Sequence, residues 1–298
     1  MIRILASGAR ATIQDPGRFA HLRDGIPTSG PMDPFAFGAA NALIGNALAA
    51  AALEIVGLPF SFVCEDRRLV VATGRDVALR GRDDIAGWTA AFARPGETYT
   101  VIGGAGARFA YLAISGGITA PPVLGSRAAY LPAGIGRALR VGDALPLGTA
   151  RVDPDRAGVS LAPPDLGASV RTIPGPHLDR FDEDAVAAFF DAAFRVEAAS
   201  DRMGTRLAGP PVTAKGGEIL TSGIVAGAVQ VPSGGAPIVL LADHQTTGGY
   251  PVIATVIAAD LGRVAQRLPG EVLRFARVDR ERALAALRAD RELLAAIA

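Results

Sequence analysis

The sequence predicts a mainly β protein built from barrels or sandwiches. Short apolar runs alternate with glycine and proline along most of the 298 residues, a pattern typical of strands joined by turns. The chain contains 36 Gly and 21 Pro, which leave little room for long helices. The expected strands are residues 68–72, 99–102, 109–114, 228–231, 237–242 and 252–257.

Three helices are expected among these strands. Asp33 is a candidate N-cap for the first, with Pro34 at the first helical position and Gly45 at the C-terminus. The second is expected over residues 182–194, where three acidic residues at the start favour the helix dipole. The third is expected over residues 280–297 and should pack on the body of its own domain.

A domain boundary is expected between about residues 153 and 176. This stretch contains five prolines and little apolar continuity, the composition of a linker or crossover. The predicted domains are an N-terminal β-rich unit at 1–165 and a C-terminal β-rich unit at 166–298 that ends in the terminal helix.

The charge balance argues against a nucleic-acid-binding surface. Lys and Arg total 30 and Asp and Glu total 29, so the formal net charge is only +1. The first apolar run is too short for a signal peptide, and polar residues interrupt the longest apolar region, 35–64. We therefore expect a soluble, cytoplasmic protein without a membrane contact.

The rare residues exclude further chemistries. Lys215 is the only lysine and no P-loop string is present. Cys64 is the only cysteine, so neither an intrachain disulfide nor a thiolate metal cluster can form. It lies in an apolar stretch and is expected to be buried and inert. None of the three histidines lies at metal-ligand spacing from another, so no histidine metal site is expected, although carboxylates remain possible Mg²⁺ ligands.

The strongest candidate for a site follows the expected strand 237–242. An acid, an amide, two hydroxyls and a phenol arrive together around a Gly-Gly pair, and they are Asp243, Gln245, Thr246, Thr247 and Tyr250. Such a cluster at a strand end predicts a polar ligand, which the glycines allow the backbone to approach closely. The alternative is a polar turn that satisfies its own hydrogen bonds.

Two further segments are candidates for anion binding. Residues 25–33 lead into the first helix, where Gly30 and the backbone N–H groups can face an anion; a capped helix after a loop explains the same pattern. Arg202 and Arg206 lie four apart around Gly204 and can clamp a carboxylate or phosphate. An exposed segment with salt bridges explains the two arginines almost as well.

Together these segments resemble a known family, variously called allophanate hydrolase subunit 2, biotin-dependent carboxyltransferase or the C-type subunit of 5-oxoprolinase. The resemblance covers about residues 1–278, and the last of its motifs is highly specific. The motifs are TIQDPGR (12–18), GPMDP (30–34), ANALIGN (40–46), LEI (53–55), YLAISGGI (111–118), PVLGS (122–126), GIG (134–136), PGP (174–176), SDRMG (200–204), VQVP (229–232) and QTTGGYP (245–251). The chain departs from the family pattern at Thr205, where relatives often carry an aromatic residue.

The resemblance implies two cyclophilin-like β-barrel units and a role as one subunit of a heteromer. With a B-type and an A-type subunit, such proteins form an ATP-dependent 5-oxoprolinase, which opens 5-oxoproline to glutamate. ATP and Mg²⁺ are then the implied cofactors, because phosphorylation of the lactam oxygen creates a leaving group before water attacks.

Side-chain chemistry suggests roles within that reaction. Arg202 and backbone amides are candidates for neutralising phosphate or the substrate carboxylate. The candidates for orienting the lactam are Gln245, Thr246, Thr247 and Tyr250. Asp33 or Asp243 is the candidate for holding Mg²⁺ or moving a proton.

Two alternatives remain open at this point. One is a carboxyltransferase-type component acting on a urea-like substrate; the absence of a biotin carboxylase region and a biotin-acceptor lysine motif argues against biotin chemistry by the chain alone. The other is a non-catalytic regulator of a histidine kinase inhibitor, as implied by relatives in spore formers. The strand-end cluster together with the arginine loop favours the enzyme subunit.

Overall fold

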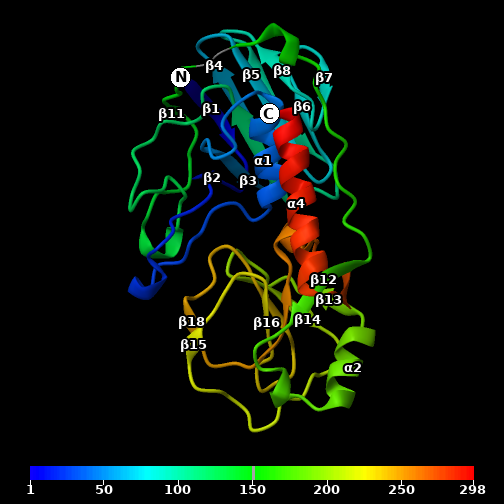
Figure 1. Cartoon of the computed structure of the whole chain (residues 1–298). Coiled ribbons are helices and arrows are strands. Elements are labelled where there is room, and N and C mark those ends of the chain that lie inside the picture. The colour runs from blue at the N-terminus through cyan, green and yellow to red at the C-terminus, as the bar shows by residue number, and fades with distance from the viewer. Residues whose placement is uncertain (150–151) are drawn as a thin grey trace. The chain divides into compact units, whose positions relative to one another are not determined.

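The computed structural model describes residues 1–149 and 152–298 (Figure 1). These residues pack into two compact units. Unit 1 consists of Met1–Arg18, Ser29–Pro164 and Arg291–Ala298, and unit 2 of Phe19–Thr28 and Asp165–Asp290. The units are therefore not two contiguous halves of the chain, because Phe19–Thr28 belongs to unit 2 and Arg291–Ala298 belongs to unit 1.

Unit 1 contains two open sheets among its described residues. The six-stranded sheet has the order β11 (Ala144–Leu145), β1 (Ile2–Ser7), β4 (Phe60–Cys64), β9 (Thr98–Gly103), β6 (Val77–Arg80) and β7 (Asp84–Ala86). The five-stranded sheet has the order β2 (Arg10–Gln14), β3 (Ala52–Val56), β10 (Phe109–Ile114), β5 (Arg68–Gly74) and β8 (Ala91–Ala93). Short 3₁₀ turns, η2 (Leu131–Ala133) and η3 (Pro154–Arg156), lie in the loops.

The core of unit 1 lies between these two sheets. Alternate residues of each strand point to one face, so Phe60 and Phe62 of β4 join Leu53, Ile55 and Leu112 of the other sheet in one buried cluster. The opposite face of the five-stranded sheet carries helix α1 (Pro34–Leu43), which contacts β10 and β5. Asp33 caps this helix by accepting from the Ala36 N–H (3.1 Å), and Gly45 ends it with φ +68°, as the sequence predicted.

Unit 2 contains a closed barrel. Its order is β12 (Ser169–Pro174), β19 (Val252–Val256), β16 (Ala228–Gln230), β17 (Ile238–Leu240), β14 (Gly204–Ala208), β13 (Phe194–Val196) and β20 (Val272–Arg277). Neighbouring strands are antiparallel except β12 and β20, whose parallel pairing closes the barrel. A separate two-stranded ribbon pairs β15 (Ser222–Gly223) with β18 (Thr247–Gly248).

The remaining helices belong wholly or partly to unit 2. They are α2 (Glu183–Asp191), α3 (Leu261–Ala265) and α4 (Arg280–Ile297), with η1 (Leu22–Asp24), η4 (Leu178–Arg180) and η5 (Ala258–Asp260) as single turns. Helix α2 packs on the barrel by stacking Phe189 on Phe275 at 4.6 Å between ring centroids. It ends before the expected Phe194, because Phe194 and its neighbours pair into β13.

The prediction of a mainly β chain is confirmed, and one closed barrel is present, in unit 2. In unit 1 the described strands form two open sheets, each with its own edges, so a second closed barrel is not seen there. The strand expected at 237–242 is shorter, since the chain turns after Leu241, whose carbonyl accepts from the His244 N–H at 3.1 Å. The last residues of α4 lie in unit 1, where Leu294 packs beside Gly38.

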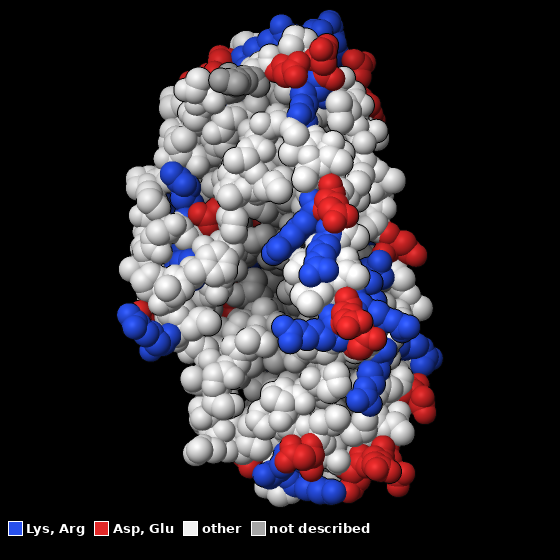
Figure 2. All heavy atoms as spheres, viewed as in Figure 1, with Lys and Arg blue, Asp and Glu red and all other residues white. Residues whose placement is uncertain are grey.

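Charged side chains of both signs are interspersed on the face shown in Figure 2, with no continuous basic area. No helix among the described residues is both long enough and apolar enough to span a bilayer.

Cys64 provides a test of the unit 1 core. Its side chain is fully buried, and burial raises the pKa of the thiol to about 12 from 9.0. A three-unit shift lowers the thiolate fraction about a thousandfold. Ellman's reagent should therefore label the native protein at least about a thousandfold more slowly than the urea-unfolded chain, and native labelling within seconds at pH 8 would contradict this core.

Candidate functional site

Unit 1 carries a row of buried polar side chains across its five-stranded sheet. Thr12 lies opposite Glu54, Glu54 opposite Tyr111, and Tyr111 opposite Thr73, so four successive strands contribute one residue each. All four side chains are buried. Since their apolar neighbours fill the core on the other face, this row must find its hydrogen bonds on the side of α1.

The loop before α1 supplies those hydrogen bonds. Glu54 Oε2 accepts from the Met32 N–H (2.8 Å) and from the Tyr111 hydroxyl (2.9 Å). The Tyr111 oxygen in turn accepts from the Asp33 N–H (2.8 Å), and Thr73 donates to the Ala36 carbonyl (2.7 Å). Burial, reinforced by the charges of Glu54 and Asp33, holds the pKa of Tyr111 well above its usual value, so the phenol keeps its proton and donates.

The two site candidates of unit 1 are therefore both fixed by local structure. Asp33 serves as the N-cap of α1, which engages one carboxylate oxygen. Gly30 has φ +88°, and a Cβ there would lie only 3.0 Å from the Pro16 carbonyl oxygen and 3.1 Å from that of Asp15. Its lack of a side chain is thus required by the packing of two loops, and a ligand role for either residue stays a prediction.

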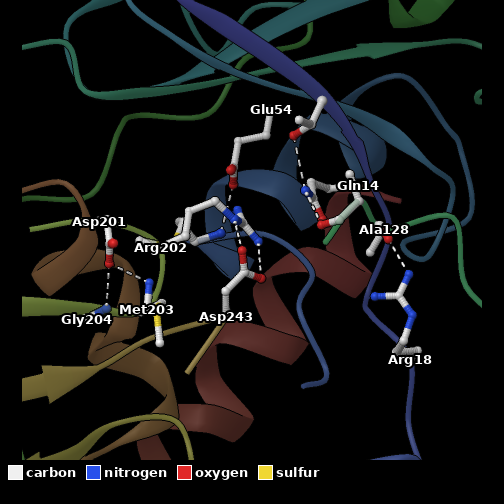
Figure 3. A network of polar contacts seen from close by, with 12 residues as sticks. Gln14, Arg18, Glu54, Ala128, Asp201, Arg202, Met203, Gly204 and Asp243 are labelled. Atoms are coloured by element: carbon white, nitrogen blue, oxygen red, sulfur yellow. Dashed lines mark hydrogen bonds and ion pairs between the residues drawn. The ribbon is translucent and has the colours of Figure 1, made fainter. Parts of the chain in front are cut away.

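The second of these loops is equally constrained. Asp15 accepts from the Ser126 hydroxyl (2.5 Å), the Arg127 N–H (2.6 Å) and the Gly17 N–H (3.0 Å). The Arg18 side chain is 1% exposed and donates to the Ala128 carbonyl (Figure 3). The TIQDPGR motif therefore ends strand β2 in a loop that the buried side chains of Asp15 and Arg18 hold in place.

In unit 2, the structure brings Arg202 and Asp243 together. Arg202 lies in a tight turn in which Asp201 accepts from the Met203 N–H at 2.8 Å. Its guanidinium binds Asp243 through both oxygens, with Nε–Oδ2 at 2.7 Å and Nη2–Oδ1 at 3.0 Å (Figure 3). Both side chains are more than nine-tenths buried. The pair continues the pairing of β14 with β17, because the Asp243 N–H also donates to the Arg202 carbonyl at 2.9 Å.

Gln245 contacts a residue that was not among the predicted site residues. Its Nε2 donates to Gln230 Oε1 at 3.2 Å. Gln230 lies in β16 and is 1% exposed. Two cavities border this amide pair: one of about 300 Å³ lined by Gln230 and Gln245, and one of about 350 Å³ lined by Gln230. Tyr250 lines both, and it also lines a third cavity of about 100 Å³ that neither glutamine touches.

The remaining predicted residues of the cluster divide into two groups. Tyr250 lines the cavities, while Thr247 is exposed and pairs in β18 with Gly223. Thr246 accepts from the Ile224 N–H through its carbonyl at 3.1 Å and lines none of the three cavities. The strand-end cluster is thus partly a turn and partly a cavity wall.

The Gly-Gly pair has a steric explanation. A Cβ at Gly248 would lie 2.4 Å from Ile224 Cδ1 and 2.8 Å from Gln230 Nε2, closer than real contacts allow. At Gly249 the nearest atom would be 3.3 Å away. Gly248 is therefore the glycine that permits the close approach to the amide pair.

The predicted carboxylates are not arranged as Mg²⁺ ligands. Both oxygens of Asp243 face Arg202, and Asp33 caps a helix. Across the part of the chain that the structure describes, no three His, Cys, Asp or Glu side chains gather as a metal site. These residues do not fit a bound Mg-ATP.

Sequence reasoning missed Glu54, Tyr111 and Gln230 as functional candidates. Each is a single polar residue between apolar neighbours in a strand, as in Leu53-Glu54-Ile55 and Val229-Gln230-Val231. The signal available in the sequence was a single polar side chain at a strand position whose neighbours are apolar.

Comparison with known proteins identifies the class. The family model of the carboxyltransferase domain, subdomain A and B, matches residues 24–277. The chain belongs to this family. It is 37% identical to the C-type subunit of 5-oxoprolinase from Escherichia coli, over 96% of this chain and 94% of that protein.

More distant relatives are much longer proteins. The urea amidolyase of Saccharomyces cerevisiae is 30% identical over 92% of this chain, which spans 16% of that protein. The crystal structure of Kluyveromyces lactis urea carboxylase superposes with a TM-score of 0.87 at 26% identity, over 100% of this chain and 29% of that one. The chain thus corresponds to nearly all of a separate subunit in one group and to a fraction of a large polypeptide in the other.

The buried ion pair generates a stability prediction. Arg202→Ala should lower the free energy of unfolding by about 3–5 kcal/mol, because it leaves the Asp243 carboxylate buried without its guanidinium. Arg206→Ala, whose side chain is exposed, should cost less than about 0.5 kcal/mol. Urea unfolding of both variants measures this, and equal small losses would show that the pair carries little stability.

A second prediction concerns pH. Burial lowers the pKa of His244 below 6.5, and its Nδ1 lies 2.6 Å from the Gln245 carbonyl oxygen, to which the neutral ring donates. The unfolded chain then binds more protons than the folded one below about pH 6.5, so stability should fall as the pH drops through this range. His244→Gln should flatten that dependence in urea unfolding between pH 7.5 and 5.5; an unchanged slope would assign it to other groups.

Proposed function

We propose that this chain is the C-type subunit of a heteromeric, ATP-dependent 5-oxoprolinase that opens 5-oxoproline to glutamate. The observation that carries the proposal is the match to the Escherichia coli subunit along nearly the full length of both chains. A second such protein, from Haemophilus influenzae, is 36% identical over 95% of this chain and 93% of its own. Partners of the B and A types, and a cytoplasmic location, belong to the same proposal.

The chemistry of the reaction divides between subunits in this proposal. A lactam is a poor electrophile, and ATP supplies the activation by phosphorylating its carbonyl oxygen. Because neither Asp33 nor Asp243 is arranged for Mg²⁺, we assign the nucleotide to another subunit. This chain then contributes recognition through an amide pair, Gln230 with Gln245, that can read an amide group.

Arg202 is buried and its guanidinium plane is fixed by the bidentate pairing with Asp243. Asp243 acts here as the residue that positions Arg202. That differs from the acid-base or metal role that side-chain chemistry alone suggested.

A second candidate is a carboxyltransferase-type component acting on a urea-like substrate. The TM-score of 0.87 with a urea carboxylase favours it, and urea and a lactam share the amide group that the Gln230–Gln245 pair could read. Sequence identity favours the first candidate, because the chain is 37% identical to the 5-oxoprolinase subunit of Escherichia coli and 30% identical to the urea amidolyase of Saccharomyces cerevisiae.

The test uses the assembled enzyme. Co-expressed with B- and A-type subunits, the chain should co-purify and support ATP hydrolysis that depends on 5-oxoproline, while the chain alone shows little or no turnover. Urea in place of 5-oxoproline, with the same subunits, is the matched control. Full 5-oxoproline-dependent ATP hydrolysis by the isolated chain would refute the heteromer, and a response to urea alone would favour the second candidate.

A further inference from the structure

Gln230 occupies an unusual position in the barrel of unit 2. Its cross-strand partners are Ile238 of β17 and Val252 of β19, and Arg206 lies opposite Ile238. All members of this row line the cavities. The adjacent row, Thr205, Val239, Val229 and Ala254, is 0% exposed. Gln230 is thus a polar residue on the outer wall of the barrel, covered by the loops that carry Ile224 and Tyr250.

The side-chain amide of Gln230 is only half satisfied. Oε1 accepts from Gln245, whereas Nε2 is buried and has no hydrogen-bond partner among the described residues. A buried donor left unpaired costs about 1–3 kcal/mol. Turning over the Gln230 amide alone would lose its bond with Gln245. Only a joint turn of both amides would keep a hydrogen bond, and it would place the Gln230 oxygen where the unpaired N–H lies.

The unpaired N–H faces the larger cavity. Gln230 Nε2 lies 2.8 Å from the place that a Cβ of Gly248 would occupy. Gly248 lines the cavity of about 350 Å³ and does not line the cavity of about 300 Å³. The larger cavity has a mostly apolar wall that includes Ile224, Val225 and Val252. Its volume falls within the range of small-molecule sites.

A second donor lies on the same wall. His177 Nδ1 accepts from the Val252 N–H at 3.3 Å. With Nδ1 accepting, Nε2 is the ring nitrogen that carries a proton. His177 lines the larger cavity, whose wall thus combines apolar surface with two N–H donors and the hydroxyls of Ser222, Tyr250 and Thr255.

We propose that this cavity is a binding site for the carbonyl end of a small neutral amide or lactam. The ligand carbonyl oxygen accepts from Gln230 Nε2, and its methylene groups pack against Ile224, Val225 and Val252. Gln230 contacts the ligand directly, and Gln245 is a positioning residue that holds the Gln230 amide with its nitrogen toward the cavity. Assignment of the lactam as 5-oxoproline rests on the proposed function; the carbonyl site itself does not.

The test measures binding of 2-pyrrolidinone, a lactam without a carboxylate, to the full purified chain by ligand-observed NMR. Gln230→Glu keeps the side-chain volume but replaces the donor by an acceptor, so the Kd should rise about 10- to 100-fold. Saturable lactam binding that Gln230→Glu leaves unaltered would overturn the proposal, as would the absence of saturable binding at tens of millimolar.

Two glycine variants provide a matched pair whose outcome does not depend on whether the Gln230→Glu variant folds correctly. Gly248→Ala places a methyl group against Gln230 Nε2 and Ile224 and should abolish the binding, whereas Gly249→Ala should leave the Kd within about twofold, with thermal unfolding recorded for both. Equal Kd values for the two variants would contradict the site.

The assembled enzyme separates this inference from the proposed function. If the complex hydrolyses ATP in response to 5-oxoproline and Gln230→Glu leaves its KM unchanged, the assignment of 5-oxoproline to this cavity is wrong and the function stands. If the complex does not respond to 5-oxoproline while 2-pyrrolidinone binds in a Gln230-dependent way, the function is wrong and the site stands.

Discussion

The buried carboxylate of Glu54 is the constraint on which unit 1 depends. A charge taken out of water must be hydrogen-bonded. Glu54 meets this requirement through the Met32 N–H and the Tyr111 hydroxyl. Those two bonds determine where the loop before α1 runs, and the Asp33 N–H bond to Tyr111 sets where the helix starts. Loop path, helix start and sheet are therefore tied through one side chain.

Unit 2 uses the same device with different chemistry. Gln230 is a single polar residue in a strand, and a loop covers it. The loop can approach closely because residue 248 is a glycine. Where Glu54 collects donors from its covering loop, Gln230 receives only one bond, from Gln245. Glu54 therefore has a structural role, whereas the unpaired N–H of Gln230 makes it a candidate for ligand recognition.

Much of the fold was predictable because it rests on local rules. The Asp33 cap with Pro34 and Gly45 defined α1, and alternation of apolar runs with glycine and proline defined the mainly β class. The site was predicted less well. Arg202 and Asp243 were both selected, yet their pairing depends on β14 lying beside β17, a contact between residues 41 positions apart. Gln230 was missed because a glutamine between two valines looks like any half-exposed strand position until the covering loop is known. The closed barrel likewise depends on the parallel pairing of β12 with β20, which no local pattern encodes.

The exchanged segments between the two units bear on how the protein is dissected. If the chain were divided between Pro164 and Asp165, each half would keep a segment that belongs to the other unit. Phe19–Thr28 of unit 2 would remain with the first half, and Arg291–Ala298 of unit 1 would remain with the second. The N-terminal fragment would lose Leu294, which packs beside Gly38, and each fragment would carry a peptide that belongs to the other unit. Limited proteolysis of the linker should accordingly leave the two products associated, so that a nicked chain runs as one species until it is denatured.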